Sequence, residues 1–325
     1  MSEALRLYRE TILEKLQEAV PNQGRLAPLV RYPLGLADAD GGPGPGVGGK
    51  LLRPSLACLA CEGLGGPPAG VLPLAAALEL VHVFSLVHDD IQDGDELRRG
   101  RSTAWKVFGT AQAINAGDAT LVLALRMARR APLEENLLST ALDALLEGTQ
   151  QMIEGQVLDL ELQQRGGDTG AYLEMARLKT GALLGCALAL GAVAAGRADL
   201  AAAHRHTGEE LGLAFQIQDD LLGLWGDPES TGKPVGSDLE EGKRTYPIVL
   251  ALEDDPQLED VLRVRPMPKE QVLGRLEEMD IRSRCRREVR CHLDAAGEAL
   301  DPLPWNEESR RAFAELAEAL AVREA

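Results

Sequence analysis

Two clusters of aspartates, each at the end of a strongly apolar stretch, are the residues of this chain best suited to do chemistry. The first cluster is VHDDIQDGDELRRG, from Val87 to Gly100, and the second begins with FQIQDDLLG at Phe215 and runs to Pro247. Carboxylates at the end of an apolar helix repel one another unless a hard divalent cation lies between them. Ligands that are all oxygen select Mg²⁺ or Mn²⁺, and Mg²⁺ usually completes its shell with waters and substrate phosphates. The clusters therefore predict a magnesium site.

Basic residues accompany both clusters. Arg98 and Arg99 follow the first, and Lys233 and Lys243 lie within the second. Arginine and lysine bind phosphate oxygens, so the anion that the metal holds is expected to be a diphosphate. The clusters lie about 130 residues apart. We therefore expect one metal-lined cleft with a cluster on each side.

The spacing of the first cluster suits a metal better than a plain helix end. Asp89 and Asp93 are four residues apart, and Asp90 is three before Asp93, so all three are neighbours on a helix surface. Like charges at this spacing destabilise a helix. A solvated acidic helix end would explain this cluster by itself. It does not explain Asp219 and Asp220, which lie in an otherwise apolar helix.

The composition favours helix and disfavours nucleic-acid binding. Aromatic residues make up only 3% of the chain while Ala and Leu dominate, a bias toward helix over strand. The formal net charge is −17, and a chain this acidic binds nucleic acid poorly. The same charge repels a free diphosphate, so bridging metal and local basic residues must reverse the field at the site.

No feature of the chain predicts secretion or stable membrane insertion. The N-terminal residues have the pattern of a charged amphipathic helix and not of a signal peptide. The longest apolar stretches, Val71–Val87 and Ala182–Gly196, are too short to span a bilayer. We therefore expect a soluble cytoplasmic protein. Its cysteines are expected to be helix thiols and not zinc ligands: Cys58, Cys61, Cys186, Cys285 and Cys291.

The pattern along the chain predicts helices joined by irregular segments, with no convincing strand and no internal repeat. Gly35–Gly49 and Pro228–Gly242, rich in Gly, Pro and Asp, are predicted loops. Because the motifs follow one another without a clean linker, we expect one all-α domain over residues 1–325. The predicted helices are Glu3–Val20, Arg53–Leu64, Leu72–Asp90, Ala111–Ala131, Leu133–Gln163, Tyr172–Ala195, Leu200–Leu224, Thr245–Glu253 and the region from Lys269 onward.

Further motifs accompany the aspartates in a fixed order. GGKLLR at Gly48–Arg53 precedes His82, which lies seven residues before DDIQD; RRG, KTG, FQIQDD, GKP and GKRTYP follow. This ordered set, about 200 residues long, resembles the trans-isoprenyl diphosphate synthases, also called polyprenyl synthetases. The resemblance implies an all-α bundle of roughly ten or more helices around a deep central cavity, usually as a homodimer. It also implies head-to-tail (1′-4) condensation of isopentenyl diphosphate with an allylic diphosphate (dimethylallyl, geranyl or farnesyl).

The resemblance also assigns residues to two substrate sites. About three Mg²⁺ ions, or Mn²⁺, would bind the allylic diphosphate. Their ligands would be Asp89, Asp90, Asp93, Asp219 and Asp220. The same diphosphate would contact Arg98, Lys179, Lys233 and Lys243. A pocket without metal would bind isopentenyl diphosphate through Lys50, Arg53, His82 and Arg99.

Thr180 and Gln216 are implied to line the reacting allylic carbon. Ionisation of the carbon–oxygen bond leaves a diphosphate anion, which metal and basic residues stabilise, and an allylic cation. The carbonyl of Lys179 and the hydroxyl of Thr180 would offer partial negative charge to that cation. No histidine or carboxylate is placed as a general base, so the released diphosphate is the expected proton acceptor.

Product length is expected to depend on Phe84, five residues before Asp89. A prenyl chain that extends from DDIQD should run along the preceding helix, and we expect Phe84 to share the helix face of Asp89. A large aromatic here, with no insertion inside DDIQD, resembles the geranylgeranyl diphosphate synthases. A farnesyl diphosphate synthase is the close alternative.

The chain departs from the family pattern at Gly223, where a third aspartate is usual, and at Leu51-Leu52, where a basic-containing stretch is common. Three other classes remain open. A class I terpene cyclase would share DDxxD but needs no isopentenyl diphosphate pocket. A catalytically silent partner subunit would usually have lost part of the first cluster, and a helical scaffold would not need Lys179 in an apolar helix.

Overall fold

The computed structural model describes residues 6–226, 236, 239–240 and 242–321. The chain groups into two compact units. The first unit contains the chain up to Thr149 together with Cys186–Arg205 and Leu303–Phe313. The second contains Gln150–Gly185, His206–Pro302 and the remainder. The expectation of a single domain over residues 1–325 stays a prediction.

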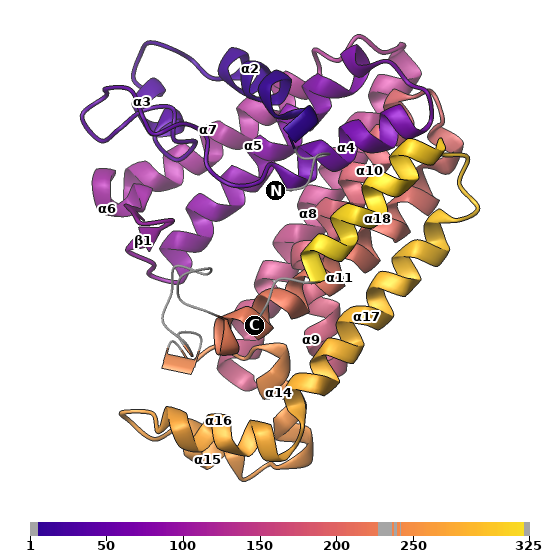
Figure 1. Cartoon of the computed structure of the whole chain (residues 1–325). Helices are drawn as coiled ribbons and strands as arrows, with labels where there is room; N and C mark the ends of the chain where they lie inside the picture. The colour runs from indigo at the N-terminus through magenta and orange to yellow at the C-terminus, as the bar shows by residue number, and fades with distance from the viewer. Residues whose placement is uncertain (1–5, 227–235, 237–238, 241, 322–325) are drawn as a thin grey trace. The chain divides into compact units, whose positions relative to one another are not determined.

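The first unit consists of helices and one short hairpin (Figure 1). Within it, α5 packs along α7 and also contacts α2 and α4. Its helices are α2 (Arg9–Ala19), α3 (Ala27–Arg31), α4 (Leu52–Gly63), α5 (Pro68–Gln92), α6 (Ala104–Phe108) and α7 (Thr110–Ala128).

Helix α5 is the apolar centre of the first unit because Leu, Ala and Val fill most of its positions. Leu74, Leu78 and Leu80 are fully buried, as expected of a helix that is apolar all round. The helix begins at Pro68, before the predicted start at Leu72. Proline is well tolerated at the first helical position, and Pro73 lies only in the second turn.

Two stretches are longer helices than the apolar runs suggested. Pro68–Gln92 and Thr169–Ala194 are long and apolar enough to cross a membrane by length and composition. In each, 83% of the most apolar window is buried inside the structure. That burial is expected of core helices.

A hairpin that the sequence pattern did not predict follows α5. Strand β1 (Leu97–Arg98) pairs antiparallel with β2 (Arg101–Ser102). The two residues between the strands, Arg99 (φ 53°) and Gly100 (φ 74°), are both left-handed, the combination that defines a type I′ turn. Strands of two residues are too short to show an alternating pattern in sequence.

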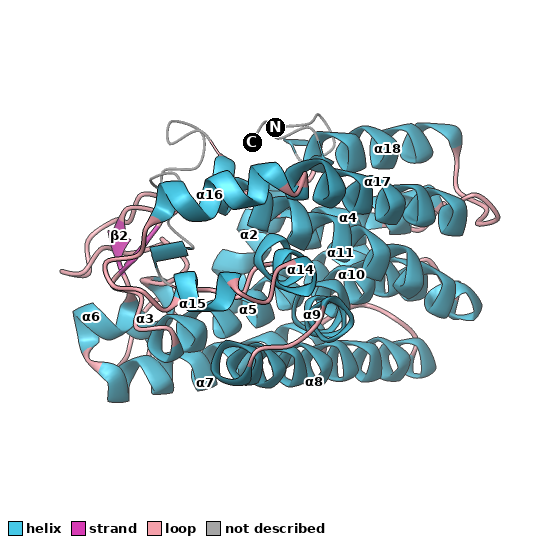
Figure 2. Cartoon of the chain, turned by 90° about the horizontal axis from the view of Figure 1, so that it is seen from below, coloured by secondary structure: helices cyan, strands magenta, loops and turns pink. Residues whose placement is uncertain are grey.

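The second unit is also helical, as Figure 2 shows. Its own helices are α9 (Thr169–Ala176), α14 (Tyr246–Asp254), α15 (Leu258–Leu262), α16 (Lys269–Glu278) and α17 (Ile281–Leu300). Four helices contribute residues to both units: α8 (Glu135–Arg165), α10 (Ala182–Ala194), α11 (Ala201–Trp225) and α18 (Glu307–Ala321).

A π-helical segment, η1 (Arg177–Gly181), interrupts the helix that was predicted over Tyr172–Ala195. Glycines on two neighbouring helices lie close to it. A Cβ on Gly155 of α8 would lie 2.1 Å from the backbone nitrogen of Lys179, and one on Gly212 of α11 would lie 2.4 Å from Cα of Gly181. These glycines let both helices touch the backbone of η1. Single π turns occur often at functional sites.

The prediction of an all-α fold is confirmed, with the hairpin and the π segment as local exceptions within the described ranges. The short helices α3 and α6 were not predicted, because five residues carry too little periodicity. Gly35–Gly49 is irregular, as expected, apart from one isolated bridge between Ala37 and Pro43. Most of Pro228–Gly242 lies outside the described residues.

Candidate active site

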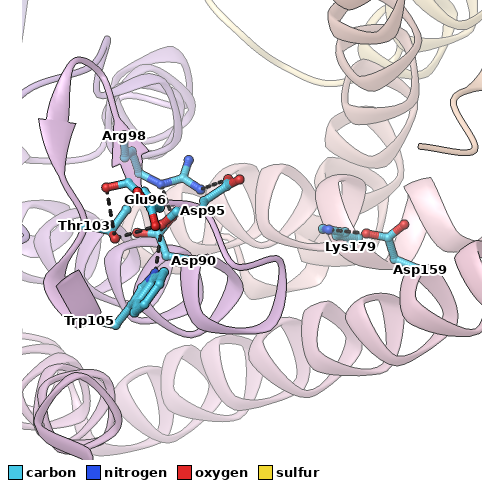
Figure 3. Close-up of polar contacts among 8 residues, drawn as sticks. All are labelled: Asp90, Asp95, Glu96, Arg98, Thr103, Trp105, Asp159 and Lys179. Atoms are coloured by element: carbon cyan, nitrogen blue, oxygen red, sulfur yellow. Dashed lines mark hydrogen bonds and ion pairs between the residues drawn. The ribbon is translucent and has the colours of Figure 1, made fainter. Parts of the chain in front are cut away.

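Asp90 and Arg98 join the end of α5 to the hairpin (Figure 3). The Nε atom of Arg98 donates a hydrogen bond of 2.6 Å to Oδ1 of Asp90, and its Nη2 lies 3.8 Å from Asp95. Asp90 is only 4% exposed. Burial raises the pKa of Asp90, and the Arg98 guanidinium opposes that shift. Asp89, in contrast, is half-buried, and Asp93 is exposed, so these two are the more accessible carboxylates of the first cluster.

Two side chains anchor the hairpin to the end of the first cluster (Figure 3). Thr103 Oγ1 and Trp105 Nε1 each donate a hydrogen bond of 2.8 Å to the backbone carbonyl of Asp95. The backbone N–H of Thr103 also donates to the carbonyl of Glu96 at 3.0 Å. These bonds join the two ends of the hairpin that carries Arg98.

Arg98 and Arg99 leave the hairpin in different directions. Arg98 reaches Asp90, whereas the guanidinium of Arg99 lies against Gly48 and Gly49. A Cβ on Gly49 would be 2.8 Å from Nη2 of Arg99. The guanidinium therefore fits here only because neither glycine has a side chain. The left-handed backbone of Arg99 turns its side chain away from that of Arg98. Their assignment to different diphosphates stays a prediction.

His82 and Glu79, three residues apart on α5, face a group of arginines. Burial lowers the pKa of His82 well below its ordinary value, and the nearby Arg53 and Arg99 lower it further. Burial raises the pKa of Glu79, whereas Arg53, Arg99 and Arg9 each lower it. Glu79 is 6% exposed. The structure thus brings three predicted pocket residues together around a buried carboxylate that was not predicted.

The glycine loop, Gly35–Gly49, precedes α4. Arg9 of α2 holds its end in place. Arg9 donates hydrogen bonds to the carbonyls of Gly49 at 3.0 Å and Val47 at 2.9 Å. Leu51 then adopts the left-handed region with φ 50°, which is unusual for a bulky side chain. This sharp turn leaves Lys50 exposed and sets Arg53, which is half-buried, in the first turn of α4.

The first unit contains a cavity of about 410 Å³ between one face of α5, the glycine loop and the hairpin. Its polar lining includes two carboxylates and three arginines, and Val83, Leu86 and Val87 supply much of its apolar wall. The charged lining residues are Glu79, Asp90, Arg98, Arg99 and Arg101. Of the four residues predicted to bind isopentenyl diphosphate, Arg99 lines this cavity.

In the second unit, Lys179 has the anionic partner that its apolar helix requires. Its Nζ atom lies 2.5 Å from Oδ2 of Asp159 on α8 (Figure 3), and the two side chains are 25% and 19% exposed. Asp159 was not predicted. Its signal was the pattern G-Q-x-x-D, in which Gly155 lets α8 touch η1 and Asp159 follows one turn later on the same face.

In the second aspartate pair, as in the first, one carboxylate is buried and the other is more accessible. Asp219 is exposed, whereas Asp220 is 7% exposed and accepts a hydrogen bond from the hydroxyl of Tyr172. Thr180 Oγ1 donates a hydrogen bond of 2.6 Å to Oε1 of Gln216. Thr180 and Gln216, predicted to lie at the reacting carbon, are therefore in direct contact.

Two further basic residues, Lys243 and Lys233, were predicted to contact the allylic diphosphate. Lys243 is half-buried next to Arg244, which is fixed by two hydrogen bonds of 2.7 Å to Glu259. Lys233 lies outside the described residues. Gly223 lies within α11 and is half-buried.

Phe84 does not share a face with Asp89, contrary to expectation. Side chains five residues apart in an α-helix lie about 140° apart around its axis. The Phe84 ring is buried and makes an edge contact with His88 at a centroid distance of 4.9 Å. His88 lies against α7, where a Cβ on Gly117 would be 2.2 Å from its Nε2 atom. Phe84 is therefore turned to the α7 side of α5.

The accessible carboxylates have the chemistry that Mg²⁺ requires. Mg²⁺ is usually bound by one or two carboxylates together with waters and substrate phosphates, and not by a complete protein cage. Among the described residues, no three acidic, histidine or cysteine side chains gather closely enough to hold a metal ion by themselves. Asp89 and Asp93 in the first unit, and Asp219 in the second, each offer oxygen donors of the kind that Mg²⁺ prefers.

Comparisons with known proteins place these features in a wider group. A family model described as polyprenyl synthetase matches residues 45–278. A crystal structure of a polyprenyl synthetase from Streptomyces coelicolor A3(2) superposes with a TM-score of 0.92 at 38% identity and covers 98% of this chain and 99% of that one.

Curated relatives include the geranylgeranyl diphosphate synthase of Mycobacterium tuberculosis, 44% identical over 229 residues. A (2E,6E)-farnesyl diphosphate synthase of Mycobacterium bovis is 43% identical over 229 residues. The matched regions cover 70% and 69% of this chain but only 65% and 62% of those relatives. The family model spans well over half of the chain. The chain therefore belongs to the polyprenyl synthetase family.

Proposed function

We propose that this chain is a prenyltransferase that joins isopentenyl diphosphate head to tail to an allylic diphosphate. The product is a short-chain all-trans prenyl diphosphate, geranylgeranyl diphosphate in the first instance. The observation that carries this proposal is the group of arginines, Arg53 and Arg99, around His82 and Glu79. It supplies a second anion site beside the aspartates, which a terpene cyclase does not need.

At that second site the chain itself supplies the charge. Arg53 and Arg99 bind the diphosphate of isopentenyl diphosphate, with exposed Lys50 at the end of the glycine loop as a third cation. His82 is kept neutral by its burial and by these arginines, so it contributes a hydrogen bond and no charge. Glu79 offsets the mutual repulsion of the arginines when no substrate is bound.

The allylic diphosphate is assigned to the accessible carboxylates Asp89, Asp93 and Asp219, which fit Mg²⁺ as ligands. Mg²⁺, when bound, neutralises the charge that develops on the leaving diphosphate. Arg98, tied to Asp90 in the first unit, and Lys179, tied to Asp159 in the second, are the cations that we assign to that anion. Both cations hold their positions before substrate arrives, which lowers the reorganisation needed during the reaction.

The allylic cation is stabilised by oxygen atoms from η1. A π turn departs from the regular i→i−4 hydrogen-bonding pattern, and we assign the carbonyl of Lys179 in this turn to the cation. The hydroxyl of Thr180 points its proton at Gln216, which leaves its lone pairs for the cation. Loss of a proton to the released diphosphate then completes the condensation.

We assign the chain to a homodimer in a reducing compartment such as the cytoplasm. On α8, Leu146, Ile153 and Val157 share one helix face and are 50%, 44% and 52% exposed. Exposed apolar side chains in a row are typical of protein interfaces. All five cysteines are free thiols, and four of them are buried, which fits a compartment that does not form disulfides.

The test is incubation with labelled isopentenyl diphosphate, Mg²⁺ and each of dimethylallyl, geranyl and farnesyl diphosphate, followed by product-length analysis. We expect isopentenyl diphosphate to be incorporated and products to stop at geranylgeranyl diphosphate. Products that stop at farnesyl diphosphate would support the proposed condensation and would replace geranylgeranyl diphosphate by farnesyl diphosphate as the product. Hydrocarbon or alcohol products formed without isopentenyl diphosphate would contradict the proposal in favour of a cyclase.

A further inference from the structure

Asp219 and Asp220 are neighbours in α11, yet only one of them is accessible. Asp219 is exposed, and Asp220 is 7% exposed. Consecutive side chains on an α-helix point about 100° apart, so the two carboxylates face different surroundings. A carboxylate that binds a substrate-bridged metal must reach the substrate, whereas a buried carboxylate must be satisfied by the chain.

The chain supplies donors to both oxygens of Asp220. The hydroxyl of Tyr172 on α9 and the backbone N–H of Tyr246, the latter at 2.7 Å, both donate to Oδ2. The side-chain amide of Gln216, one turn earlier on α11, donates to Oδ1 at 3.1 Å. Hydrogen bonds to a buried carboxylate are stronger than those between neutral groups. Asp220 is therefore fixed by three elements of the second unit.

This contact decides the orientation of Gln216. An amide side chain has one NH₂ group and one carbonyl oxygen, and the NH₂ group is directed at Asp220. The carbonyl oxygen, Oε1, then accepts the hydroxyl proton of Thr180 at 2.6 Å. If the amide were flipped, its NH₂ group would face Thr180 and the hydroxyl proton would have to point elsewhere.

Tyr172 is the outer anchor of this chain of hydrogen bonds. It is 1% exposed, and its ring lies 5.3 Å from that of Tyr246. Its hydroxyl is the donor in the contact with Asp220, because an ionised carboxylate can only accept a hydrogen bond. It lies in the helix that leads directly into η1, two turns before Lys179.

We propose that Tyr172 is a positioning residue, which holds Asp220 so that Gln216 directs the Thr180 hydroxyl proton away from the allylic carbon. Asp220 then acts through hydrogen bonds and is not a metal ligand, in contrast to Asp219. The inference rests on the proposed prenyltransferase function. It adds a residue that neither the motif pattern nor the assignment of metal ligands contains.

The first test is Tyr172→Phe, which removes only the hydroxyl. A lost hydrogen bond to a charged group should lower kcat about tenfold, with KM for isopentenyl diphosphate unchanged within about twofold. Tyr8→Phe is the matched control, because Tyr8 also donates from a buried hydroxyl to a carboxylate, that of Glu62, but lies in the first unit. Its acceptor Glu62 is exposed, unlike Asp220. The variant removes a tyrosine–carboxylate hydrogen bond and should leave kcat unchanged.

A double-mutant cycle shows whether Tyr172 acts through Gln216. Gln216→Met removes both amide hydrogen bonds, so adding Tyr172→Phe to it should lower kcat by less than about twofold further. Multiplicative losses would overturn the proposal. It would also be overturned by a Tyr172→Phe enzyme with wild-type kcat, or by one that does not fold while Tyr8→Phe folds.

A binding measurement separates positioning from metal binding. The probe is a non-reactive thiolo analogue of the allylic diphosphate, titrated at several Mg²⁺ concentrations. Asp219→Asn should weaken Mg²⁺-dependent binding more than about tenfold, whereas Asp220→Asn and Tyr172→Phe should change it less than about threefold. An equal loss for Asp220→Asn would make it a metal ligand and overturn the assignment. A wild-type enzyme that fails to condense substrates would contradict the proposed function instead.

Discussion

At the scale of single residues, each aspartate pair divides its carboxylates between solvent and the chain. Asp90 and Asp220 are buried and accept hydrogen bonds from Arg98 and Tyr172. Asp89 and Asp219 are the more exposed members. The buried member is expected to fix the backbone and rotamer of its neighbour, because a charged hydrogen bond in a poorly solvated site is strong. Sequence alone makes the two members of a pair look equivalent.

The length of the product is expected to change in Phe84→Ala. Removing the ring opens space on the α7 side of α5, next to His88. Each added isoprene unit extends the tail by about 4–5 Å, roughly three residues of helix rise. Product analysis should show chains longer than the wild-type ones, with little loss of total condensation.

Val87→Ala is the control for that prediction, because Val87 is a buried residue of the same helix that lines the cavity of the first unit. It should leave product length unchanged. The opposite outcome, a shift for Val87→Ala and none for Phe84→Ala, would place the growing tail in that cavity and not beside α7.

At the scale of elements, η1 is the feature that brings together the residues of the second unit that we propose to be catalytic. Lys179 and Thr180 lie in this one segment and find partners on two different helices, Asp159 on α8 and Gln216 on α11. The close approach of these helices depends on glycines that face η1. The π turn is therefore supported by packing and is not a local preference of the RLKTG sequence.

Gly155→Ala should disrupt that packing. The new Cβ would lie 2.1 Å from the backbone nitrogen of Lys179, and a rigid backbone cannot yield. We expect a loss of about 1–3 kcal/mol of stability and a larger fall in kcat than in substrate affinity, measured by urea unfolding and steady-state kinetics. Gly297→Ala, at a helical glycine with no atom within 4 Å of the added Cβ, should instead stabilise by roughly 0.5–1 kcal/mol. Equal stability for the two variants would contradict the packing account.

A buried histidine in the first unit gives stability a pH dependence of known sign. His204 Nδ1 donates to the carbonyl of Leu200 at 2.9 Å, and its Nε2 accepts from Trp305 Nε1 at 2.8 Å. Burial lowers the pKa of His204 below its ordinary value of 6.5. The unfolded chain therefore binds a proton that the folded chain excludes. Stability from this group is fully present above pH 6.5 and falls as the pH drops toward the folded pKa.

The measurement is the urea midpoint between pH 8 and pH 5. His204→Gln should show a shallower loss on acidification than the wild type, with a residual slope from His82, whose pKa is also lowered. His206→Gln replaces an exposed histidine two residues later on the same helix and is the control. An unchanged slope in His204→Gln would contradict the assignment.

The sequence predicted the elements that have strong local signals and missed those that depend on distant partners. The long apolar run before DDIQD predicted α5 because every turn of that helix is buried. The hairpin was missed because its turn is set by left-handed backbone at Arg99 and Gly100, and Arg-Gly is not a common turn sequence. Tyr172 and Asp159 were missed because their roles come from residues 48 and 20 positions away.

At the scale of the whole molecule, the exposed apolar face of α8 predicts a homodimer. Light scattering should give twice the 34.8 kDa chain mass. Val157→Asp, which places a charge on that face, should shift the protein toward monomer, because burying an unpaired charge in an interface is strongly unfavourable. Val264→Asp changes an equally exposed valine outside any long helix and should remain dimeric. A monomeric wild type, or dissociation by both substitutions alike, would contradict this interface.

In each aspartate pair, one carboxylate is proposed to bind metal and the other to accept hydrogen bonds from the chain. Locating the metal tests this most directly. Crystals grown with Mn²⁺ and a thiolo analogue of the allylic diphosphate would show the ions by anomalous scattering. We predict metal within coordination distance, about 2.0–2.3 Å, of Asp89, Asp93 and Asp219, with Asp90 still bound to Arg98 and Asp220 still bound to Tyr172. Metal coordinated by Asp90 or Asp220 in place of those contacts would contradict it.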